Sequence, residues 1–224
     1  MLELKKTYLS KTRYSDSIIV TLSVLAISLL FSHIYWFNHF DLSSYLAANK
    51  ELVFKHAQFQ RLFFSVLIHS DLSHLLSNSF MLSIFGILIH RYFGSWLFPL
   101  LTYLASVVSH CLSLLTYPDD KIYLVGASGW VFLLGGCWLC LYVCIEKKER
   151  ILKRLFKTVG VGLVLFSPQS FLPEVSYRTH AIGFFVGIIL GLSYYLIRKR
   201  YIDSFLIYEE VIEEEDDDIP YELE

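Results

Sequence analysis

Gly126-Ala127-Ser128-Gly129, followed by the apolar run of residues 130–145, is the stretch that decides how this chain folds. Its small residues allow a sharp backbone turn and leave room for another helix or a substrate beside the Ser128 hydroxyl. The first N–H groups of a helix have no partner within it, so negative charge that develops beside this hydroxyl is favoured. Small-residue clusters are also common packing devices in membrane helices. The stretch therefore predicts either a reactive serine or a close helix contact.

The composition indicates a multi-span membrane protein. Of the 224 residues, 55% are hydrophobic and 18% are charged, whereas soluble globular chains have about 25% charged residues. The net charge of −2 hides an asymmetry, because residues 209–224 hold ten acidic and no basic residues. The rest of the chain carries 19 basic and 11 acidic residues, a net charge of +8. The basic residues lie in short clusters beside apolar runs, which is typical of membrane orientation rather than nucleic-acid binding.

The four cysteines lie inside apolar runs without a polar second shell, so we expect small apolar helix residues rather than a metal site, and no cofactor. They are Cys111, Cys137, Cys140 and Cys144. Basic residues precede the first apolar segment, which is too long for the core of a signal peptide and is predicted to be a retained span.

Hydropathy predicts six membrane spans. They cover residues 17–37, 71–90, 96–116, 126–145, 155–172 and 179–197, and the fifth is the weakest because Pro168 and Pro173 lie near its end. Residues 38–68 mix aromatic with polar side chains, which favours an interfacial loop with short amphipathic helices.

Three regions follow: a basic tail (1–16), a six-span membrane domain (17–200) and an acidic tail (201–224) predicted to be disordered. With six spans, the basic clusters fall on one side, so the positive-inside rule places both termini in the cytoplasm. The stretch around Ser128, the His69 region and the loop of residues 168–178 then face outward.

Polar side chains open the second predicted span, where ionisable groups are costly and usually functional. His74 and Asn78 are four residues apart and share one helix face, and His69 lies just before them. Hydrogen bonds between helices are the alternative explanation, worth about 0.6–2 kcal/mol per contact. We expect a site, because all three side chains lie at the predicted depth of Ser128.

His180 begins the sixth predicted span, above a stripe of glycines at four-residue spacing: Gly183, Gly187 and Gly191. Such a stripe lets another helix approach closely. If that helix is the fourth span, His180 could accept the Ser128 proton, and a serine hydroxyl is a weak nucleophile until such a base is adjacent. A buried neutral histidine bonded to a carbonyl is the alternative.

These motifs, in this order, resemble those of the rhomboid family of intramembrane serine proteases: His69-x4-His74-x3-Asn78, Gly126-Ala127-Ser128-Gly129 and His180-x2-Gly183-x3-Gly187. The resemblance covers roughly residues 59–200. It implies a rhomboid-like bundle of six transmembrane helices, all-α, with a cavity open to the outside. It also implies a Ser128–His180 dyad without an acid, and an oxyanion hole made by the Ser128 and Ala127 N–H groups, His74 and Asn78. Arg61 corresponds to an arginine of the family's first-loop motif.

Three positions depart from that pattern. Gln60 stands where the family often has a tryptophan, His90 where it often has a glutamate four residues before a glycine, and Phe132 where it has a packing tyrosine. Phe132 can still stack on His180 but cannot donate a hydrogen bond.

The predicted function is that of a serine endopeptidase in a cell membrane, with the bacterial inner membrane as the expected location. Its partners would be the lipid bilayer and membrane proteins, single-span or multi-span, which it cuts near the outer ends of their transmembrane helices, and no nucleic acid. Two alternatives stay open: a rhomboid-like pseudoprotease that binds transmembrane clients without cutting them, and a small transporter using the His/Asn cluster. The transporter is disfavoured because the chain shows no internal repeat.

Overall fold

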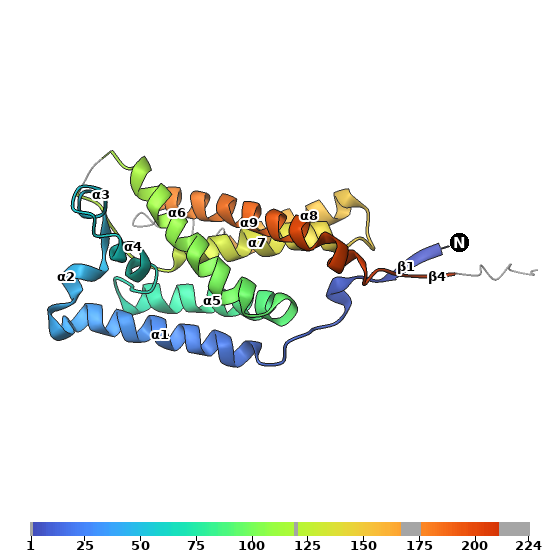
Figure 1. The fold of residues 1–224 in the computed structure, drawn as a ribbon, viewed down its shortest axis with the longest axis horizontal. Helices are drawn as coiled ribbons and strands as arrows, with labels where there is room; N and C mark the ends of the chain where they lie inside the picture. The colour runs from blue at the N-terminus through green and yellow to red at the C-terminus, as the bar shows by residue number, and fades with distance from the viewer. Residues whose placement is uncertain (1, 119–120, 167–175, 211–224) are drawn as a thin grey trace, which may run out of the picture.

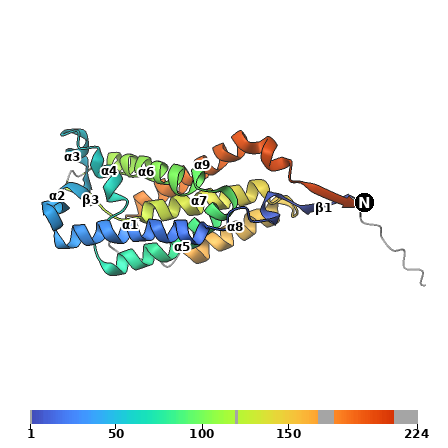
Figure 2. The same cartoon turned by 60° about the horizontal axis from the view of Figure 1, so that its bottom comes forward.

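The computed structural model describes residues 2–118, 121–166 and 176–210, and these fold into a bundle of long helices. Figure 1 shows the helices running along the long axis, with the short helices α2–α4 at one end and the first and last described residues at the other. We call these the α2–α4 end and the terminal end. Figure 2 shows α7 in the middle of the bundle. Of its apolar window 67% is buried, against 28% for α1 and for α9.

Five helical segments are long and apolar enough to cross a membrane within the described residues, which confirms the predicted membrane class. They are α1 (Ser17–Phe37), α5 (Leu72–Phe93), the segment Trp96–Thr116, α7 (Ser128–Ile145) and α9 (Tyr177–Asp203).

Local sequence accounts for the ends of α5 and for an interruption in the third span. The side chain of Asp71 caps α5 by accepting from the His74 amide (2.8 Å), and Gly94, at φ 76°, ends it. The third span has the predicted bounds, Trp96–Thr116, but it is interrupted near its start. Pro99 cannot donate a backbone hydrogen bond, and Phe98 is extended, so a short helix at Trp96–Leu101 precedes α6 (Thr102–Thr116).

The fifth predicted span corresponds to α8 (Ile151–Phe166), which starts four residues earlier than expected. Its 16 residues measure about 24 Å at 1.5 Å per residue, less than the ~30 Å apolar core of a bilayer. The remaining residues of this predicted span, with Pro168 and Pro173, lie outside the described residues.

The predicted interfacial loop contains three short helices, α2 (Ser43–Leu46), α3 (Lys50–Phe54) and α4 (Gln60–Ser65). Strand β2 (Ala48–Asn49) pairs antiparallel with β3 (Tyr123–Leu124), just before Gly126. The buried Arg61 holds this region together, because its Nη1 donates to the Ser44 and Ala47 carbonyls (2.7 and 2.9 Å).

Glycines bring α7 and α9 into backbone contact. A Cβ at Gly183 would collide with the Gly129 carbonyl oxygen, and one at Gly187 with that of Leu133. A glycine of α7 makes the same kind of contact with α9, since a Cβ at Gly136 would collide with the Phe184 carbonyl. This close crossing fixes the beginning of α9 against the beginning of α7.

The two tails meet at the terminal end. Strand β1 (Leu2–Lys6) pairs antiparallel with β4 (Ile207–Glu210), and the Arg13 guanidinium lies over the rings of Tyr8 (3.9 Å) and Phe205 (4.1 Å). The expectation of disorder from residue 201 onward is therefore wrong for residues 201–210. The N-terminal segment supplies a partner strand that composition alone does not reveal. Residues 211–224 lie outside the described residues.

Candidate functional site

Ser128 is the first residue of α7 and is half-buried. The Val131 amide is bonded to the Ala127 carbonyl (2.8 Å), so the amides of Ser128, Gly129 and Trp130 precede the intrahelical ladder. Gly126 adopts φ +113°, which an L side chain rarely does, and a Cβ there would lie 2.5 Å from His74 Cε1. The Gly126 amide donates to the Ser65 carbonyl (2.9 Å), which fastens the turn to α4.

His180 lies one turn into α9, at the same end of the bundle as Ser128, and is 5% exposed. Its ring stacks on Phe132 with centroids 4.0 Å apart and an interplanar angle of 17°. The contact between Gly183 and Gly129 joins the two helices within one turn of both residues. Among the described residues, no hydrogen bond joins the Ser128 hydroxyl to the His180 ring.

His69 connects α1 to the turn before Ser128. Its Nε2 accepts from the Ala127 amide (3.3 Å), so its Nδ1 carries the proton and donates to Ser32 Oγ (3.1 Å). Burial, with His74 nearby, lowers the pKa of His69 to about 3, so its ring is neutral at physiological pH. The Ala127 amide, which the sequence predicts as an oxyanion donor, is thus bonded to His69 in this structure.

His74 and Asn78 share one face of α5, four residues apart. A carboxylate can only accept, so Ser70 Oγ donates to Asp71 Oδ2 (2.8 Å) and His74 Nδ1–H donates to Ser70 Oγ (3.2 Å). Asn78 is 2% exposed, and its amide nitrogen, Nδ2, has no hydrogen-bond partner. Burying a donor without a partner costs free energy. Such a donor is therefore typical of a binding site whose ligand supplies the acceptor.

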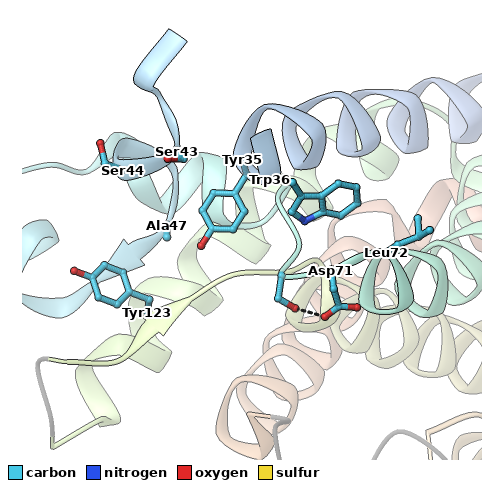
Figure 3. Close-up of a pocket in the computed structure, with 9 residues that line it drawn as sticks. Tyr35, Trp36, Ser43, Ser44, Ala47, Asp71, Leu72 and Tyr123 are labelled. Atoms are coloured by element: carbon cyan, nitrogen blue, oxygen red, sulfur yellow. Dashed lines mark hydrogen bonds between the residues drawn. The ribbon is translucent and has the colours of Figure 1, made fainter. Parts of the chain in front are cut away.

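A cavity of about 850 Å³ opens at the α2–α4 end beside these residues. Figure 3 shows Tyr35, Trp36, Tyr123 and Asp71 around it, together with the hydrogen bond from Ser70 to Asp71. A second cavity of about 470 Å³ lies between α7, α8 and α9 and is lined by His180 and Phe132.

The sequence analysis missed His110, which lies on α6. His110 is 1% exposed, and its Nδ1 shares a hydrogen bond with Ser65 Oγ (3.0 Å). Its Nε2 has no hydrogen-bond partner and would lie 3.3 Å from a Cβ added at Gly129. An ionisable side chain inside a predicted span was the available signal. His110 and Ser65 support the two ends of the turn that carries Ser128.

Comparison with known proteins identifies the family. The rhomboid domain matches residues 56–197, well over half of the chain. The chain belongs to the rhomboid family. A relative from Bacillus subtilis (strain 168), described as "Putative rhomboid protease YdcA", is 27% identical over 141 residues, covering 62% of this chain and 68% of the relative. The rhomboid domain thus contains every predicted site residue, from Arg61 to Gly187.

The three departures from the rhomboid pattern lie in different surroundings. His90 is fully buried at the terminal end, where its Nε2 lies 3.0 Å from Ser95 Oγ and its ring meets that of Tyr14 at 5.6 Å. Phe132 keeps the stacking contact with His180. Gln60 begins α4 beside the buried Arg61, whose Nε donates instead to Gln58 (2.6 Å).

Proposed function

We propose that this rhomboid-family protein is an intramembrane serine endopeptidase with a Ser128–His180 dyad. The observation that carries the proposal is the backbone contact between Gly129 and Gly183, which brings the first turns of α7 and α9 together. Ser128 Oγ attacks a peptide carbonyl while His180 takes its proton. His180 then gives that proton to the leaving amine, and water hydrolyses the acyl-enzyme by the same route.

The oxyanion of the tetrahedral intermediate is stabilised by the Ser128 amide and by the Asn78 side chain. Asn78 Nδ2 supports this role because it is buried without a partner. His74 contributes a third donor only when its ring carries a second proton, since its Nδ1–H is bonded to Ser70.

The substrate is another membrane protein, cut near the outer end of a transmembrane helix. The short basic segments of the chain lie at the terminal end, so the positive-inside rule makes that end cytoplasmic and the α2–α4 end external. A helix offers no accessible peptide bond until it unwinds, which favours substrates with glycine or other weak helix formers at the cut site.

Cleavage of a single-span model substrate in liposomes tests the dyad. We expect Ser128→Ala and His180→Ala each to abolish cleavage while the protein stays folded, and a fluorophosphonate to label the wild type but not Ser128→Ala. Ser23→Ala is the matched control, because the Ser23 hydroxyl only back-bonds within α1. Asn78→Ala should lower kcat by about 10²–10³-fold and leave partial activity.

Undiminished turnover in either dyad variant would contradict the assignment. Binding of the model substrate without cleavage or labelling by the wild type would favour the pseudoprotease instead. A wild-type rate for Asn78→Ala would remove only its role as an oxyanion donor.

A further inference from the structure

We propose that the cavity at the α2–α4 end binds a basic side chain, arginine or lysine, of the substrate segment next to the cut site. The cavity is lined by three aromatic rings and a single charged group, Asp71. This proposal rests on the proposed proteolytic function and names a class of substrate for it.

The walls of the cavity suit a cation because three aromatic rings line them and one of these rings is held in place. Tyr35 and Trp36 come from the last turn of α1 and Tyr123 from β3, as Figure 3 shows. The Trp36 indole N–H donates to the His69 carbonyl (2.7 Å), which fixes the ring beside the Ser70–Asp71 turn. A guanidinium or ammonium group is attracted to the face of such rings.

Asp71 provides a negative charge that no described cation neutralises. It accepts from the His74 amide (2.8 Å) and from Ser70 Oγ (2.8 Å), and these hydrogen bonds hold its pKa below its usual value. None of the described salt bridges includes it, and His69 beside it is neutral. Its charge is therefore available to a ligand.

Arg61 is bonded to two residues of the opposite wall, and it does not line the cavity. It is 3% exposed, and it donates to the carbonyls of Ser44 and Ala47 from behind that wall. We therefore expect the basic side chain to lie on the Asp71–Trp36 side of the cavity.

Two lining residues connect the cavity to the candidate active site. Ser70 lines it and accepts from His74, and Tyr123 lines it three residues before Gly126. All the lining residues lie at or beyond helix ends at the α2–α4 end, so the occupant comes from a part of the substrate outside the apolar core of the membrane.

The test is a charge scan of the model substrate, with full-length protein in liposomes. Each of several positions on either side of the cut is changed in turn to arginine, glutamine or glutamate, and kcat/KM is measured. At one position or more we expect arginine to be preferred over glutamine by about tenfold and glutamate to be disfavoured. Asp71→Asn should bring the arginine-to-glutamine ratio close to one, because asparagine keeps the helix cap and removes the charge.

Asp41→Asn is the matched control, since Asp41 lies in the same external region and does not line the cavity. It should leave the ratio unchanged. A ratio near one at every position in the wild type, or a preference that survives in Asp71→Asn, would overturn this inference. In both cases cleavage would persist and the proposed protease function would stand, whereas cleavage that survives Ser128→Ala would remove the proposed function itself.

Discussion

Single residues at this site form hydrogen bonds with more than one secondary-structure element, and His69 is the clearest case. Through its two ring nitrogens and its carbonyl it joins Ser32 and Trp36 of α1 to Ala127 before α7. It can do so only as a neutral ring, because Nε2 must accept while Nδ1 donates. We therefore interpret His69, predicted from the sequence as part of the site, as a positioning residue for the turn that carries Ser128.

This role predicts a specific acid sensitivity. The pKa of His69 falls from an ordinary value of 6.5 to about 3 in the folded protein because the ring is buried. Between these values the unfolded chain binds a proton that the folded protein does not, so the contribution of His69 to stability is complete above about pH 6.5 and is lost as the pH falls towards 3. His69→Gln should lower the free energy of unfolding by about 1–3 kcal/mol at pH 7.

The measurement is the Tm of wild type and His69→Gln in detergent from pH 7.5 to pH 4. The difference in Tm should shrink as the pH falls, while His33→Gln, at an exposed histidine of α1, should follow the wild type throughout. Parallel Tm curves for wild type and His69→Gln would exclude this role.

At the scale of elements, the crossing of α7 and α9 determines where the candidate dyad lies. The four-residue glycine spacing on α9 meets backbone carbonyls of α7, which cannot move aside as a flexible side chain can. We therefore expect Gly187→Ala to destabilise the protein by about 1–3 kcal/mol or more and to abolish cleavage, because the added Cβ collides with the Leu133 carbonyl.

Gly160→Ala on α8 is the matched control, since nothing lies within 4 Å of its added Cβ. Thermal unfolding in detergent and cleavage of the model substrate are measured together. Equal Tm values for the two alanine variants would show that the close crossing of α7 and α9 is not needed for the stability of the fold.

Five of the six predicted spans correspond to long apolar helical segments, because hydropathy alone is enough to predict them, and α1 has the predicted bounds. The interruption at Phe98 was not anticipated, although Pro99 was its signal. Within the site, helical periodicity was enough to put His74 and Asn78 on one face. The bond from Ala127 to His69 and the place of His110 beside Gly129 depend on tertiary packing between distant segments, which no local pattern encodes.

At the scale of the whole molecule, the chain separates two ends of different chemistry. The terminal end holds the β1–β4 ladder and the ion pair between Lys147 and Asp203 (2.8 Å). The α2–α4 end holds the candidate dyad and the cavity around Asp71. The proposed proteolysis needs water, and non-helical backbone within a membrane is tolerated only beside protein or water, so we expect the turn before Ser128 to face the wet side of the bundle.

The orientation of these ends in the membrane is the remaining prediction. Cytoplasmic loops attract lysine and arginine, and the terminal end carries the basic clusters, so we expect Ser10 inside and Ser44 outside the cell. Both serines are exposed, and the four native cysteines can be replaced by alanine to give a background without thiols. In intact cells, a membrane-impermeant maleimide should label Ser44→Cys at once and Ser10→Cys only after permeabilisation. The reverse pattern would turn the candidate active site towards the cytoplasm, and the substrate would then have to be cut at its inner end.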